Sequence, residues 1–270
     1  MKKLFLIIAI LFSSVVFSQE MKVHKTNGNV ESFLLSQIDS ITFNISSIIP
    51  TQGLVAYYPF NGNANDESGN GNNGITTGTT LSTDRFGNSN KAYSFNGSNN
   101  YITVNNSLLS NTFSSFTISC WIQTTMASGP GQIIADRFTT GYPYKYSMMN
   151  QSNGTVTAGS HDGGSNTNNV ISTPVNIGNG QWRHIIVVLD ASLLKYGIYI
   201  DGTFNIEITN INTGAWSSLS NPTSIGVSRG PSGYDFANWF SGKLDDIRVY
   251  NRALSASEIS QLYHESGWVK

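Results

Sequence analysis

Short apolar segments, each followed by turn residues, recur at close intervals between Gly53 and Tyr250. Their length and their alternation of apolar and polar residues are typical of β-strands that bury one face. A long series of such strands predicts a sandwich or a barrel. The predicted strands are residues 54–60, 92–95, 101–104, 116–123, 132–136, 144–149, 155–159, 182–189, 196–201, 204–208, 223–227 and 240–250.

The composition agrees with an all-β chain and excludes several classes of protein. Charged residues make up 11% of the sequence, against roughly 25% in an average soluble domain, so helices laced with surface ion pairs are not expected. The 26 glycines are typical of a chain rich in turns. The formal net charge of −1 lacks the basic excess of a protein that binds nucleic acid, so we expect no nucleic-acid partner.

Residues 1–18 are predicted to be a secretory signal peptide. Lys2 and Lys3 precede an apolar run that ends by Phe17, and the small residue Ser18 marks the expected cleavage site. The alternative is a membrane anchor, but the run of about 14 residues is shorter than the roughly 18 needed to span a bilayer. We therefore expect an exported protein, periplasmic, on the cell surface or extracellular, with no membrane span.

The single cysteine, Cys120, excludes an intramolecular disulfide. It lies in an alternating segment, which predicts a half-buried strand position and not a catalytic thiol.

Residues 19–49 are predicted to form a short β-hairpin leader and a linker. The Asn27-Gly28 pair marks the hairpin turn. Because an isolated hairpin is only marginally stable, this segment must dock on the main domain, pair with a partner or serve in processing. The main domain is expected to comprise residues 50–265, and residues 266–270 form a C-terminal tail.

One helix is predicted near the C-terminus. Ser255 and Glu258 form a capping box, and Leu254 and Ile259 occupy the positions of a hydrophobic staple. The helix is expected to end before Gly267 and to pack its apolar side against the sandwich.

The most distinct hairpin is predicted at the Asp201-Gly202 turn. Strict alternation places Ile198 and Ile200 on one face of the first strand. In the returning strand, one face would carry Phe204, Ile206 and Ile208.

Seven motifs occur in a fixed order along the chain. They are GLVAYYPF at 53–60, NDESGNG at 65–71, YSFNG at 93–97, FTISCW at 116–121, QWRHI at 181–185, YIDG at 199–202 and GKLDDIRVYNRALS at 242–255. With this order and spacing, residues 53–263 resemble the LamG-like (laminin G, concanavalin A-like) jelly rolls of secreted bacterial proteins. The resemblance implies an all-β fold, a two-sheet antiparallel jelly-roll sandwich, here with a short C-terminal helix.

The resemblance also implies a structural calcium ion. In similar jelly-roll glycosidases, the aspartate at the position matching Asp245 binds a structural calcium, and the resemblance would place Asp66 beside it. Calcium takes six to eight oxygen ligands, which aspartates and loop carbonyls supply. The alternative is that both are turn or salt-bridge residues. Asp246 should alternate to the other face of its strand and pair with Arg248 or a neighbouring strand.

Aromatic side chains near turn-rich sequence are candidates for sugar recognition, because their rings stack on the apolar faces of sugars. Trp121 and Trp182 are assigned to the core instead. The alternative for every candidate is packing between the sheets. The candidate ligand-binding residues are Tyr142, Tyr144, Trp216, Tyr234 and Trp239.

A catalytic pattern is missing from the sequence. Jelly-roll glycosidases carry two glutamates around an aspartate on one strand, whereas no two glutamates share a predicted strand here. The G-x-S-x-G match at residues 226–230 is followed by Pro231 and not by the helix that a nucleophile elbow needs.

We therefore expect an exported, non-catalytic binding module, a calcium-stabilised jelly roll that recognises a glycan or a glycosylated surface. The second hypothesis is a protein-binding adhesive or structural module. The third is a glycoside hydrolase or lyase.

Overall fold

The computed structural model describes residues 20–24, 28–35, 49–109, 114–125, 130–136, 145–161, 168–211, 222–229 and 236–268. The predicted signal peptide lies outside these residues. The chain divides into two compact units, Met1–Ser46 and Ser47–Lys270. No helix of the described segments is long and apolar enough to cross a membrane.

The first unit contains the predicted hairpin. Strand β1 (Glu20–His24) pairs antiparallel with β2 (Val30–Leu34). Gly28 has a φ of 86°, which supplies the left-handed residue of the turn. Every residue of β2 is exposed.

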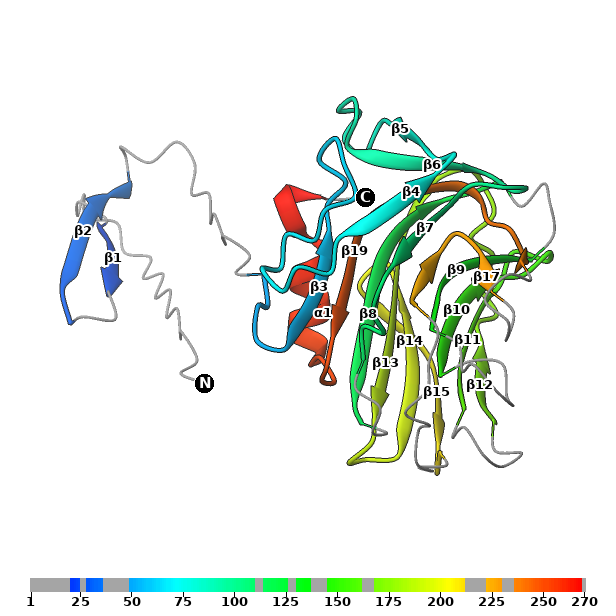
Figure 1. Cartoon of the computed structure of the whole chain (residues 1–270). Helices are drawn as coiled ribbons and strands as arrows, with labels where there is room; N and C mark the ends of the chain where they lie inside the picture. Colours follow the sequence, from blue (N-terminus) through cyan, green and yellow to red (C-terminus); the bar gives the residue numbers. More distant parts are fainter. Residues whose placement is uncertain are drawn as a thin grey trace. The chain divides into compact units, whose positions relative to one another are not determined.

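The second unit is built on two antiparallel sheets, which confirms the predicted fold class (Figure 1). Among the described residues, the first sheet has seven strands, in the order β12 (Asn168–Ser172), β11 (Val156–His161), β10 (Tyr146–Asn150), β9 (Gly131–Asp136), β16 (Ser224–Ile225), β7 (Tyr101–Val104) and β4 (Gly74–Thr77). The apolar side chains between the sheets form the main core.

The second sheet has eight strands in the described part of the chain. Its order is β15 (Thr203–Thr209), β14 (Lys195–Ile200), β13 (Trp182–Asp190), β8 (Phe116–Gln123), β19 (Ser241–Tyr250), β6 (Ala92–Asn96) and β5 (Thr80–Ser82), and β3 (Leu54–Tyr58) also pairs with β19. A separate short pair joins β17 (Ser228–Arg229) to β18 (Phe236–Ala237).

The predicted helix is present as α1 (Ala256–Tyr263), followed by the 3₁₀ turn η2 (Glu265–Gly267). The Ser255 side chain accepts the Glu258 N–H, and the Glu258 carboxylate accepts the Ser255 N–H, so the capping box is confirmed. Helix α1 lies on the side of the eight-stranded sheet away from the seven-stranded sheet (Figure 1). There it forms a second apolar cluster with the sheet, comprising Ile186, Tyr250, Leu254, Ile259 and Leu262.

The two tryptophans assigned to the core differ in burial. Trp121 is fully buried, but it lies on the helix side of the sheet, where its ring stacks on Tyr263. Trp182 is only half-buried, so its core assignment is wrong. Cys120 points the other way from Trp121 into the main core, where it is fully buried and not half-buried as predicted.

The hairpin of β14 and β15 corrects one prediction about side-chain faces. Asp201 and Gly202 have φ values of 50° and 71°, as a two-residue type I′ turn requires. Tyr199 lies opposite Phe204, and the register then shifts by one residue, so that Ile198 lies opposite Ile206. Because of this bulge, Phe204 is exposed and contacts Tyr199, while Ile206 packs toward the main core.

Candidate functional site

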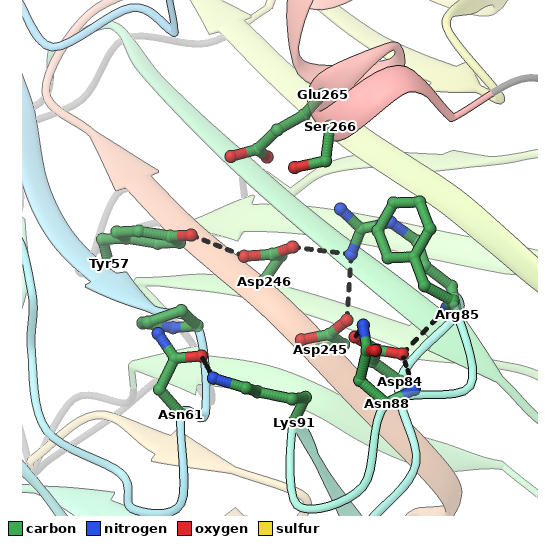
Figure 2. Close-up of a pocket in the computed structure, with 12 residues that line it drawn as sticks. Tyr57, Asn61, Asp84, Arg85, Asn88, Lys91, Asp245, Asp246, Glu265 and Ser266 are labelled. Carbon is green, nitrogen blue, oxygen red and sulfur yellow. Dashed lines mark hydrogen bonds and ion pairs between the residues drawn. The ribbon is translucent and has the colours of Figure 1, made fainter.

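A pocket of about 460 Å³ lies beside strand β19 of the eight-stranded sheet (Figure 2). Strand β3, the loop of residues 83–91 between β5 and β6, strand β19 and the turn η2 meet there. Its walls are mostly polar. The lining residues are Tyr57, Pro59, Asn61, Asp84, Arg85, Phe86, Asn88, Lys91, Asp245, Asp246, Glu265 and Ser266.

The loop between β5 and β6 is shaped by one aspartate. The Asp84 Oδ1 accepts the backbone N–H groups of Phe86 and Asn88, each at 2.8 Å, and its Oδ2 accepts the Asn88 amide at 3.0 Å. Gly87 adopts a φ of 86° to close the turn. The turn leaves Phe86 42% exposed, whereas Arg85 is buried.

Arg85 joins two adjacent carboxylates. Its Nη1 lies 2.9 Å from Asp245 Oδ2 and 2.6 Å from Asp246 Oδ2 (Figure 2). The guanidinium carbon lies 4.5 Å from the ring centroid of Trp121 and 4.6 Å from that of Phe86. Arg85 is therefore enclosed by two aromatic rings and paired with two acids.

A β-bulge explains why both aspartates reach the same arginine. Asp245 lies opposite Trp121 in β8, and Arg248 lies opposite Ser119, so β19 carries one extra residue. Asp246 sits at this bulge with a φ of 46°. The expected alternation of Asp246 to the other face is wrong, because the bulge returns its carboxylate to the side of Asp245.

A second buried arginine extends the charged network. The Nη2 of Arg248 lies 2.7 Å from Glu265 Oε1 and 3.6 Å from Asp246 Oδ1, the latter in line with the pairing expected for Asp246. Its guanidinium lies 3.9 Å from the ring centroid of Tyr57. The Tyr57 hydroxyl donates to Asp246 Oδ1 at 2.7 Å. The two arginines and three carboxylates thus form one connected group beside the pocket.

Burial shifts the acidities of this group. Burial and the neighbouring Asp246 carboxylate raise the pKa of Asp245, and the charge of Arg85 opposes this shift. Burial also raises the pKa of Glu265, although Arg248 opposes the change. These directions follow from the cost of charging a carboxylate away from water.

His184 packs against Trp121 near this site, and its titration predicts how the stability of the domain changes in acid. It is fully buried, its ring centroid lies 4.7 Å from that of Trp121, and its Nε2 lies 2.8 Å from the Ser119 hydroxyl. Burial, together with the charges of Arg248 and Arg85, lowers its pKa well below the usual value. Below about pH 6.5 the unfolded chain therefore binds a proton that the folded chain does not.

We expect this histidine to make the free energy of unfolding fall by about 1.4 kcal/mol per pH unit below about pH 6.5. Its contribution is present above that pH and is lost as the pH falls. Urea unfolding at a series of pH values, for the wild type and His184→Gln, measures the slope. The variant should lack this part of it; equal slopes would contradict the prediction.

The two aspartates predicted to bind calcium serve separate networks. Asp66 Oδ1 accepts the N–H groups of Tyr57 and Ser68, each at 2.9 Å, and its Oδ2 accepts that of Asn72 at 3.0 Å. Asp245 is paired with Arg85. In the described segments, no three acidic, histidine or cysteine side chains are arranged so that they could hold a metal ion.

A calcium ion at Asp245 would also face the charge of Arg85. A divalent and a monovalent cation about 5 Å apart repel each other by roughly 7 kcal/mol at an effective dielectric constant of 20. The residues therefore do not fit a calcium ion held between Asp66 and Asp245.

One of the predicted ligand-binding aromatics falls within the described residues. Trp239 is half-buried, and its ring centroid lies 6.0 Å from that of Tyr101. The other predicted aromatics lie outside the described residues: Tyr142, Tyr144, Trp216 and Tyr234.

Sequence reasoning missed Arg85 and Phe86. The signal that could have found them is the Asp84 turn, whose aspartate precedes Gly87 and Asn88 at turn spacing. No sequence signal indicated that the C-terminal tail packs on the domain, where the ring centroids of Trp268 and Trp121 lie 5.1 Å apart.

Comparisons with known proteins identify the superfamily of this fold. A family model described as the concanavalin A-like lectin/glucanases superfamily matches residues 95–260. The binding domain of Paraclostridial Mosquitocidal Protein 1 is similar with a TM-score of 0.62 and 21% identity, over 78% of this chain and 52% of that chain.

Two further structures share the fold. Domain 4 of AbnA, a GH43 extracellular arabinanase from Geobacillus stearothermophilus, was solved in complex with arabinotriose. It has a TM-score of 0.59 and 22% identity, over 78% of this chain and 98% of that domain. A third structure is of botulinum neurotoxin type C, whose cell entry is described as dependent on interaction with two ganglioside molecules. It has a TM-score of 0.59 and 16% identity, over 78% of this chain and 51% of that chain. This chain spans about half the length of the two toxin chains.

Proposed function

Because this chain belongs to the concanavalin A-like lectin/glucanase superfamily, we propose that it is an exported, non-catalytic carbohydrate-binding module. We place the ligand in the pocket beside Phe86. The predicted signal peptide at residues 1–18 supports export. The fold occurs in both lectins and hydrolases, so the argument for binding rests on the site.

The observation that carries this proposal is the chemistry of the pocket wall. Phe86 offers a partly exposed ring that packs against the guanidinium of Arg85 and forms a T-shaped pair with Trp268, 5.6 Å away between centroids. Exposed amide and ammonium groups also line the pocket, on Asn88 and Lys91 among others. An aromatic face beside fixed polar groups is the combination that holds a sugar ring and its hydroxyls.

The two aspartates of β19 are poorly placed for glycoside hydrolysis. That reaction needs two carboxyl groups on opposite sides of the scissile bond, one of them an acid and the other a base or nucleophile. Asp245 and Asp246 are adjacent and share one nitrogen of Arg85. The arabinotriose complex of the similar AbnA domain gives further support to a binding role.

The test is titration of the mature protein against a panel of oligosaccharides, including arabinotriose. Phe86→Ala should weaken binding of the recognised sugar about tenfold, equivalent to about 1.4 kcal/mol. Leu193→Ala is the matched control, because Leu193 is 62% exposed and does not line the pocket. Thermal unfolding of each variant checks that the fold persists.

The other outcomes are equally informative. Loss of binding in Trp239→Ala but not in Phe86→Ala would move the ligand to the Trp239 side and contradict the assigned pocket. Release of products from a polysaccharide by the purified protein would contradict the non-catalytic role. Failure of every sugar to bind would overturn the carbohydrate proposal and favour the protein-binding hypothesis.

A further inference from the structure

Two buried aspartates that are neighbours in sequence contact the same nitrogen of Arg85. Asp245 and Asp246 are 2% and 8% exposed, and one oxygen of each lies within 2.9 Å of Arg85 Nη1. Buried like charges repel unless a cation lies between them. The structure shows that cation to be a side chain of the chain itself.

Arg85 is held by aromatic packing and by the turn that carries it. Its guanidinium lies against the rings of Trp121 and Phe86, and Trp268 forms a T-shaped pair with each of these rings. The Asp84 turn fixes the backbone on which it sits. Removing the guanidinium from the carboxylates would require opening this aromatic packing.

The contact joins distant parts of the sequence. Arg85 and Asp245 are 160 residues apart, on the loop before β6 and on the closing strand β19. A structural calcium ion was expected to make such a junction. Asp66, the second expected calcium ligand, is instead engaged by three backbone N–H groups of its own neighbourhood.

We propose that Arg85 replaces a structural cation in this sandwich: it ties β19 to the loop before β6, and the folded domain does not depend on calcium. An exported protein of this kind would keep its stability where calcium is scarce. The inference concerns stability and is independent of the sugar proposal.

The test is thermal unfolding of the mature full chain in EDTA and in millimolar calcium chloride. The wild-type midpoint should be the same in both. Arg85→Gln leaves two buried carboxylates without a cation, so its midpoint should fall by roughly 6 to 20 °C, equally in both solutions.

Lys91→Gln is the matched control. Lys91 also lines the pocket, but it is exposed and its ammonium donates to Asn61 alone. Loss of this charge should leave the midpoint nearly unchanged, as expected for an exposed polar contact. A drop equal to that of Arg85→Gln would contradict the specific role of Arg85.

A second measurement applies if Arg85→Gln fails to fold. Calorimetric titration of the wild type with calcium chloride should give no binding heat. Calcium binding, or a calcium-dependent rise of the wild-type midpoint, that Asp245→Asn abolishes would overturn the proposal. Sugar titration in EDTA is a separate readout, so failure of one proposal leaves the other open to its own test.

Discussion

Arg248→Met is expected to lower the free energy of unfolding by about 3 to 5 kcal/mol, the usual cost of removing one partner from a buried ion pair. Arg248 is 1% exposed, and its guanidinium is packed on Tyr57 and paired with Glu265 and Asp246. Methionine fills much of the volume but leaves Glu265, whose side chain is only 14% exposed, without its cation. The pKa of Glu265 is already raised by burial, and the loss of Arg248 removes the main opposing charge.

Chemical denaturation of the wild type and the variant measures this change. Lys195→Met is the matched control, because Lys195 also pairs with a glutamate, Glu207, at 3.0 Å, but its side chain is 42% exposed. That surface pair should contribute at most about 1 kcal/mol. Equal losses in the two variants would show that burial of the Arg248 pair has no energetic consequence.

Trp121→Ala is expected to destabilise the domain by about 3 to 5 kcal/mol, as for other large aromatic side chains removed from a packed interior. Trp121 is fully buried, its ring stacks on that of His184, and the guanidinium of Arg85 packs against it. Its removal leaves a cavity beneath the pocket. The midpoint of thermal unfolding should fall by roughly 6 to 20 °C.

Trp182→Ala provides the comparison. The two tryptophans were both expected in the core, but Trp182 is half-buried at the start of β13. A partly exposed side chain loses less packing when truncated, so the decrease should be clearly smaller than for Trp121. If Trp182→Ala were the more damaging change, the burial seen at the two positions would not govern their stability.

Several elements could be predicted because their signals are local. Strands β7 and β8 begin and end at the predicted residues, since alternation and turn residues mark both ends. The capping box of α1 and the Asp201-Gly202 turn depend on residues only a few positions apart. Strands β4, β5 and β12 were missed, because short polar segments carry no burial pattern of their own.

Alternation failed where a strand carries an extra residue. Neither the bulge at Asp246 nor the register shift opposite Tyr199 has a marker that simple alternation can detect. A bulge arises from pairing with a neighbouring strand, so it depends on contacts that a local pattern does not contain. This is why the faces of Asp246 and Phe204 were predicted wrongly.

Local residue patterns were thus enough to establish an all-β sandwich, its main strands and its closing helix. They also supplied the family, through motifs in a fixed order. Which charged groups pair with one another could be seen only in the folded chain. A carboxylate such as Asp245 can bind either a metal ion or an arginine. Which of them it binds depends on the fold, because its partner Arg85 lies 160 residues away in the sequence. Tertiary packing brings Arg85 there, against the rings of Phe86 and Trp121, and its charge offsets the repulsion between the two buried carboxylates.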